Sequence, residues 1–203
     1  MMLRVAALLL VAVVPPVAAQ ETIPKAFEAY RTALLAEDGH AVVGLVDSGT
    51  LAYYGQGVEW ALDADSADVA AMRLIDRLMV FSLRHRVPAD TVRAFDGASS
   101  LSYAVRKGWI GAGSVQRLQI VRTEATGPTG FATFDERGQI RMGFTREEGR
   151  WKVDLTSMLP LANLAFHQVA VDAGQTDDEM LFQILGSLTT RQPDRRIWQP
   201  LGR

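Results

Sequence analysis

The first apolar run of the chain has the spacing of a helix. Thr22 is a candidate N-cap at the start of "TIPKAFEAYRTALLAEDGH", and Gly39 ends the segment. Between them, Phe27, Tyr30 and Leu34 recur at spacings of three and four residues. This periodicity predicts an amphipathic helix of roughly three to four turns, with these side chains directed towards the core.

The next apolar patterns predict a short strand between further helices. Residues 41–50 indicate another helical turn or two, whereas "TLAYYGQ" at 50–56 has the threonine and tyrosine content of a short strand. Helical spacing returns over 66–86 and ends before a proline. Two shorter helices are predicted at 88–95 and 97–108, each closed by a glycine.

Between residues 114 and 158 the pattern changes to alternation. Four short segments, separated by glycine-containing turns, place apolar residues two positions apart. The alternating positions are Leu118, Ile120, Ile140, Met142, Phe144, Trp151, Val153 and Leu155. A period of two predicts strands with one buried face, and short turns favour antiparallel neighbours, so we predict a four-stranded meander.

Helical spacing returns at the end of the chain. Residues 159–174 and 176–188 predict two amphipathic helices, and Thr176 with Glu179 has the pattern of a capping box. Residues 191–203 read as a loose polar tail.

This order of elements predicts the fold class. Helices, then an antiparallel meander, then helices again indicate an α+β domain over residues 20–190. We expect a curved antiparallel sheet with N-terminal helices packed on its concave face and extra C-terminal helices.

The first nineteen residues have the pattern of a secretory signal peptide. Arg4 precedes an apolar run from Val5 to Val14, which is too short to span a bilayer of about 30 Å. Two prolines and small residues follow, so cleavage is expected after Ala19. An exported protein, periplasmic or secreted and without a stable membrane anchor, is predicted.

Composition and charge exclude several kinds of chemistry. The chain has no cysteine, which removes thiol catalysis and zinc–thiolate sites. Cleavage would take one of its 21 basic residues, leaving 20 against 23 acidic residues, a net charge of −3. Basic and acidic residues are mixed without a basic tract, which argues against nucleic acid and anionic membranes as partners.

Sequence motifs for metals and cofactors are missing. There is no glycine-rich phosphate loop, nucleophile elbow or H-E-x-x-H helix. The three histidines, His40, His85 and His167, stand singly. Neither a metal nor a cofactor is predicted.

Three segments together resemble a known superfamily. "AFEAYRTALLAEDGHAVVGLV", the short "AYYG" and the hairpin "GFTREEGRWKVDLTSM" are similar to the nuclear transport factor two-like superfamily, which includes SnoaL-like cyclases and ketosteroid isomerase. The resemblance covers about residues 24–158. It departs from the family in the long helical stretch 66–108 and in about forty residues after the last strand.

The resemblance implies a cone-shaped fold around a pocket, often in a homodimer. The residues expected to line that pocket are Phe27, Tyr30, Tyr54, Trp60, Met72 and Trp151. An enzyme of this kind would need a carboxylate base and an oxyanion donor. The candidate bases are Asp47, Asp96 and Asp154, and the candidate donors are Tyr30, Tyr53, Tyr54 and Trp60.

Alternation argues against Asp154 as the base. Trp151 and Val153 form an apolar row, which leaves Lys152 and Asp154 on the opposite face. Burying an unpaired carboxylate is costly, so Asp154 is expected to face solvent, a dimer partner or a cation on the neighbouring strand such as Arg141.

The predicted function is therefore binding. We expect a small apolar molecule or a protein partner as the ligand, with no clear catalytic machinery. The alternative is a cofactor-free lyase or isomerase, with Asp47 or Asp96 as base and Tyr30 or Tyr54 as donor. A third option is an interaction module in which the C-terminal helices cover the pocket or dock a partner.

Overall fold

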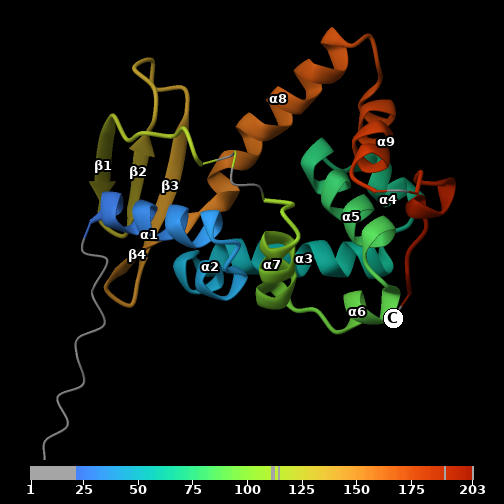
Figure 1. Ribbon diagram of the computed structural model, residues 1–203, viewed down its shortest axis with the longest axis horizontal. Helices are drawn as coiled ribbons and strands as arrows, with labels where there is room; N and C mark the ends of the chain where they lie inside the picture. The colour runs from blue at the N-terminus through green and yellow to red at the C-terminus, as the bar shows by residue number, and fades with distance from the viewer. Residues whose placement is uncertain (1–21, 111–112, 114, 190, 203) are drawn as a thin grey trace, which may run out of the picture.

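The computed structural model describes residues 22–110, 113, 115–189 and 191–202, so the predicted signal peptide lies outside the described residues. In this part of the chain the α+β class is confirmed, with nine α-helices and one four-stranded antiparallel sheet (Figure 1). The helices are α1 (Ile23–Leu35), α2 (Gly39–Leu45), α3 (Ser48–Asp63), α4 (Ser66–Ala71), α5 (Leu74–Arg86), α6 (Ala89–Arg93), α7 (Gly97–Arg106), α8 (Leu159–Asp172) and α9 (Asp177–Ser187). The strands are β1 (Arg122–Thr126), β2 (Thr129–Thr133), β3 (Arg141–Glu147) and β4 (Arg150–Asp154), and the short 3-10 helices are η2 (Leu155–Met158) and η3 (Arg195–Trp198).

The sheet is an open meander in the order β1-β2-β3-β4, as the alternation predicted. Phe144 of β3 lies opposite Val153 of β4, and Met142 lies opposite Ala132 of β2. All four side chains are buried, so the apolar row predicted for β3 and β4 is the inner face of the sheet. Leu118 and Ile120 precede β1 instead of belonging to it.

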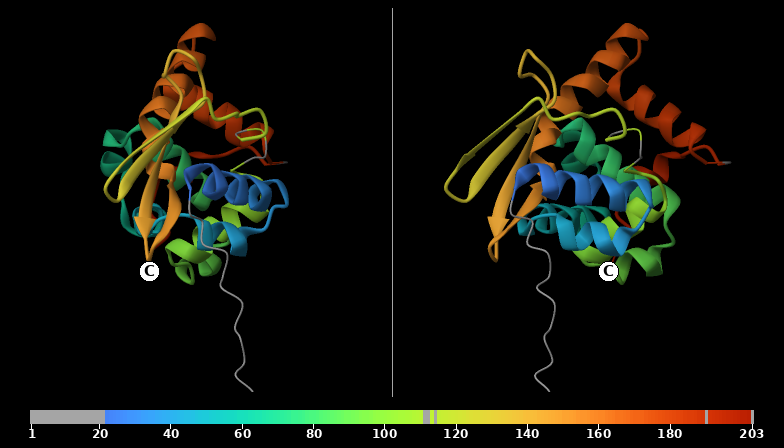
Figure 2. Two further views of the ribbon diagram at one scale, coloured as in Figure 1. Left: turned by 90° about the vertical axis from the view of Figure 1, so that its left-hand side faces the viewer. Right: turned by 60° about the vertical axis from the view of Figure 1, so that its left-hand side comes forward.

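Helix α1 lies across that inner face (Figures 1 and 2). Its N-cap is Thr22, whose hydroxyl accepts a hydrogen bond from the Lys25 amide at 3.4 Å. A Cβ on Gly130 of β2 would lie 2.6 Å from the Ile23 side chain, so glycine is what lets the first turn of α1 approach the sheet. The core between α1 and the sheet is therefore tightly filled.

Helices α3, α4, α5 and α6 pack beside the sheet around cores of their own, whereas α2 and α7 place Val42, Leu101 and Val105 in the core shared by α1 and the sheet (Figure 2). The strand predicted at 50–56 is wrong, because residues 48–63 form α3. The helix predicted over 66–86 is two helices, α4 and α5, since Met72 and Arg73 are extended.

The C-terminal helices lead from the sheet back to α5. Helix α8 runs from the end of the sheet to α9, which returns beside α5 (Figure 1). The predicted capping box of Thr176 and Glu179 is present at the start of α9. Helix α8 exposes Leu164, Val169 and Val171, with exposed fractions of 64%, 58% and 54%.

Several residues of the segment 191–202, which is predicted to be a loose polar tail, contact the helices. Ile197 is buried, and Trp198 contacts the Phe81 ring of α5 with centroids 4.9 Å apart. The Leu201 amide donates to the Ala61 carbonyl at the end of α3. None of the helices in the described ranges is long and apolar enough to cross a membrane.

Candidate functional site

Three of the predicted pocket residues lie in the core. Phe27, Tyr30 and Trp151 are 0%, 1% and 6% exposed, and they pack between α1 and the sheet. Burial raises the pKa of the Tyr30 hydroxyl above its usual value. These side chains line neither the cavity nor the clefts described below, because they fill the space in which the cone-shaped pocket was expected.

Asp47 and Asp96 both cap helices. Asp47 is buried at the start of α3, where it accepts hydrogen bonds from the Thr50 amide at 2.8 Å and the Thr145 hydroxyl at 2.9 Å. Asp96 is exposed at the start of α7, and hydrogen bonds from Ser99 hold the pKa of its carboxyl below the usual range. Neither aspartate lines the cavity or either cleft, so each has a local structural role that sequence spacing alone did not reveal.

Asp154 is also a cap. It accepts hydrogen bonds from the amides of Thr156 at 2.9 Å and Ser157 at 3.2 Å, which start η2. Its cross-strand neighbour is Gly143 and not Arg141, so of the expected environments the pairing with Arg141 is not formed. The ion pair of Arg141 is with Glu124 instead.

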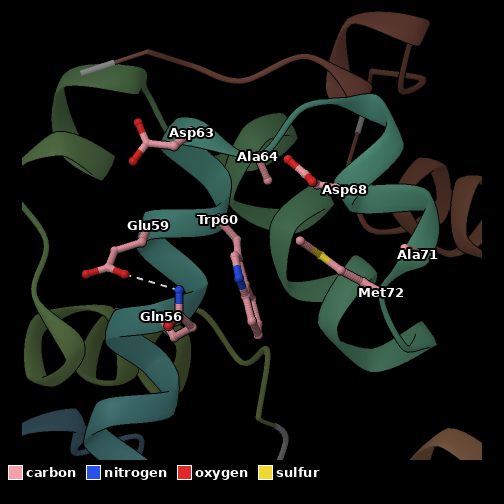
Figure 3. Close-up of a pocket in the computed structure, with 8 residues that line it drawn as sticks. All are labelled: Gln56, Glu59, Trp60, Asp63, Ala64, Asp68, Ala71 and Met72. Atoms are coloured by element: carbon pink, nitrogen blue, oxygen red, sulfur yellow. Dashed lines mark hydrogen bonds between the residues drawn. The ribbon is translucent and has the colours of Figure 1, made fainter.

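Trp60 and Met72 lie on an open cleft (Figure 3). Its volume is about 520 Å³, and it lies between α3, α4 and the segment that follows α4. Its other lining residues are Gln56, Glu59, Asp63, Ala64, Asp68 and Ala71. Gln56 donates to the Glu59 carboxylate at 3.1 Å on the rim. The three acidic side chains and the width of the opening make this cleft a poor site for an apolar molecule.

Tyr54 lines a more enclosed cavity of about 360 Å³. Five helices, α3, α5, α7, α8 and α9, and the segment after α7 form its walls. The lining residues are Tyr53, Tyr54, Ile75, Leu78, Met79, Ser82, Arg86, Ala104, Lys107, Gly108, Trp109, Ile110, Leu159, Phe166, Ile184 and Leu188. The set is mainly apolar and aromatic and contains no carboxylate, which is the usual character of a site for a small apolar ligand.

Tyr53 and Tyr54 line this cavity together because α3 is a helix. Adjacent residues of a strand point to opposite faces, whereas adjacent residues of a helix differ by about 100° in direction. Burial raises the pKa of both hydroxyls, and for Tyr54 the neighbouring Tyr30 adds to the effect. Both phenols are therefore protonated at neutral pH.

A buried carboxylate fixes Tyr53. The Tyr53 hydroxyl donates a hydrogen bond to the Asp76 carboxylate at 2.7 Å, and this carboxylate also accepts one from the Arg73 guanidinium at 2.8 Å. Asp76 is 4% exposed, and sequence reasoning missed it. The sequence did offer one sign of this role: Asp76 is a single carboxylate within the apolar helical spacing of residues 74–83. A carboxylate buried there is stable only with a hydrogen-bond or charge partner.

One face of α5 forms the longest wall of the cavity. Ile75, Met79, Ser82 and Arg86 recur along it, so the wall changes from apolar to polar to cationic. With a rise of about 1.5 Å per residue, the distance from Ile75 to Arg86 is about 16 Å. The cavity therefore has an apolar end and a cationic end.

Two aromatic rings hold the cationic end. The Arg86 guanidinium lies 4.4 Å from the Trp109 ring centroid, and the Lys107 ammonium lies 5.6 Å from that of Tyr103. The two rings meet edge to face, with centroids 5.6 Å apart. Within the described residues, neither cation forms an ion pair with a carboxylate.

A smaller cleft of about 280 Å³ continues from this end, since Arg86, Lys107 and Trp109 line it too. Its other side is formed by residues that include His85 and Arg191. The positive charge thus extends beyond the mouth of the cavity. In the part of the chain that the structure describes, no cluster of three or more histidine or acidic side chains could hold a metal ion.

No family model, curated protein or solved structure matches this chain.

Proposed function

We propose that this protein binds a small apolar molecule in the cavity between α3, α5, α7, α8 and α9, and that it does so as an exported protein. The observation that carries the proposal is the cavity itself, about 360 Å³ with mainly apolar walls and no lining carboxylate. Cavities of roughly 300–1,000 Å³ with such walls are typical of ligand sites. Leu159 and Phe166 of α8 and Ile184 of α9 cover it, which gives the C-terminal helices a role in the site.

An uncharged apolar dye, N-phenylnaphthylamine, tests the proposal by its fluorescence on binding. Ala104 is buried and lines the cavity, so Ala104→Phe should fill the space and abolish the signal. The matched control is Ala52→Phe on the exposed side of α3, which should bind as the wild type does. Thermal unfolding must show that both variants fold.

Two outcomes would count against the proposal. One is a wild-type protein that binds no apolar probe, and the other is a folded Ala104→Phe variant that binds the dye unchanged. Native mass spectrometry of protein from its own host adds the identity of any co-purifying ligand and the number of subunits.

The lyase or isomerase alternative has less support. Asp47 and Asp96 are helix caps outside the cavity, so neither carboxylate can reach a molecule bound beside Tyr54. Membership of the nuclear transport factor two-like superfamily, with its cone-shaped sheet, stays a proposal. It is supported by the packing of α1 on a four-stranded antiparallel sheet.

A homodimer is a second candidate, favoured by the exposed side of α8. Leu164 and Val171 are seven residues apart, so they share one face of the helix, and both are more than half exposed. If a second copy covers this face, light scattering coupled to size exclusion should give a dimer mass for the wild type and a monomer mass for Leu164→Glu/Val171→Glu. A monomeric wild type would remove this candidate.

A further inference from the structure

The cavity combines two properties that a purely apolar ligand would not use. One end of the α5 wall carries Ile75 and Met79, and the other end carries Arg86 with Lys107 beside it. We propose that the natural ligand is an anionic amphiphile, with its apolar chain along α5 and its head group between Arg86 and Lys107. This inference rests on the proposed function, because it names the chemical class of ligand for the same cavity.

Among the described residues, no carboxylate pairs with Arg86 or Lys107. Arg86 is only partly exposed, and burial lowers the pKa of its guanidinium. A cation that has lost part of its hydration gains more from an opposite charge than a solvated one does. The contacts of Arg86 and Lys107 with Trp109 and Tyr103 hold both cations in place without neutralising them.

The Arg86 guanidinium is suited to bind an anionic head group. The Arg86 guanidinium lies over the Trp109 ring, and a contact with an aromatic ring uses none of the N–H groups that a guanidinium offers for hydrogen bonds. Those groups match the two oxygens of a carboxylate or a phosphate. Lys107 adds a point charge on the same side, since it lines both the cavity and the adjoining cleft.

A free anion, a hydrocarbon and a cationic amphiphile each match the cavity less well. A free anion would leave the apolar walls at Ile75, Met79 and Phe166 uncovered, and a hydrocarbon would place uncharged atoms against two cations. A cationic amphiphile would meet like charge. The positive charge at this end of the cavity is a local feature, since the chain as a whole has a net charge of −2.

Competition for the bound dye tests the head group. The competitors share one twelve-carbon chain and differ in the charge of the head group: dodecanoate, dodecyl phosphate, dodecanol and dodecyltrimethylammonium. The affinity of each is measured by its displacement of N-phenylnaphthylamine from the full mature protein. At least one of the two anions should bind at least about tenfold more tightly than dodecanol. The cation should bind more weakly than dodecanol. The ranking of the two anions then distinguishes a carboxylate from a phosphate head group.

A double variant locates the effect. Arg86→Gln/Lys107→Gln should reduce the preference for the anion over dodecanol by about tenfold. The control, Arg117→Gln/Arg137→Gln, removes the same charge from exposed positions outside the cavity and should keep the preference. Added salt should weaken the binding of the anion and leave the binding of dodecanol unchanged.

The two proposals fail in different ways. Dodecanol that binds as tightly as both anions would overturn the anionic head group and leave the apolar cavity standing. A preference that survives in the folded double variant would overturn the assignment to Arg86 and Lys107. If neither the dye nor any of the four amphiphiles binds, the proposed function falls together with this inference.

Discussion

Arg84 holds together the end of α3 and the C-terminal residues, and its replacement should strongly destabilise the protein. The side chain is 7% exposed, and it donates four hydrogen bonds to backbone carbonyls. The acceptors, with distances of 2.8, 3.0, 2.6 and 3.1 Å, are the carbonyls of Trp60, Ala61, Ala64 and Ile197. Burial lowers the pKa of Arg84 to about 10, so the group is still charged at neutral pH.

The size of the effect follows from these bonds. A hydrogen bond from a charged donor contributes about 1.5–3 kcal/mol, but the buried guanidinium also loses hydration, which offsets part of the sum. Arg84→Met should therefore lower the free energy of unfolding by about 4 kcal/mol, because it removes all four bonds. The carbonyls of Trp60 and Ala61 keep backbone donors, so the cost of lost partners falls on those of Ala64 and Ile197. Arg84→Lys keeps the charge and loses the planar fork, so we expect a loss of about 2 kcal/mol.

Urea denaturation followed by far-ultraviolet circular dichroism measures both variants. Arg137→Met, at an exposed turn of the sheet, is the control and should change the free energy by less than about 0.5 kcal/mol. A loss below about 1 kcal/mol for Arg84→Met would refute the reasoning, since it would mean that water satisfies these carbonyls as well as the guanidinium does.

Three further predictions concern other parts of the molecule. A Cβ on Gly97 would collide with the Leu51 carbonyl, so Gly97→Ala should separate α7 from α3. The free energy of unfolding in the same urea assay should fall by about 1–3 kcal/mol, and an unchanged value would contradict the close approach of the two helices. Burial holds the pKa of His85 below 6.5, so the unfolded chain binds a proton there first, and the free energy of unfolding should fall as pH drops below about 6.5. His85→Gln should flatten that dependence, and an unchanged slope would assign it to other groups. Mass spectrometry of exported protein should give an N-terminus at Gln20, whereas retention of the first nineteen residues would contradict the predicted cleavage after Ala19.

Local signals predicted many of the elements correctly. The alternation in β3 and β4 placed Phe144 and Val153 on the buried face, and the two register partners confirm it. The predicted caps Thr22 and Thr176 also start helices, although the capping roles of Asp47 and Asp96 were missed. These features depend on neighbours within a few residues, so the sequence contains what decides them.

The segment 50–56 shows where local reasoning fails. Its threonine and tyrosine residues have high strand propensity, but that propensity largely reflects packing on a sheet surface. Here Asp47 caps the segment, and the buried positions Thr50, Val58 and Ala61 have helical spacing once 57–63 are included. The apolar spacing over residues 50–63 therefore favours a helix, and in this helix Tyr53 and Tyr54 both line the same cavity.

The sequence by itself determined which segments are helices or strands over most of the chain, because caps and periodicity act between near neighbours. Only the tertiary structure decided where empty space remains. Phe27, Tyr30 and Trp151 fill the space between α1 and the sheet in which the pocket was expected. The observed cavity forms where α8 and α9 meet α5, whose residues lie about a hundred positions earlier in the chain, and no local pattern records how well such distant surfaces fit.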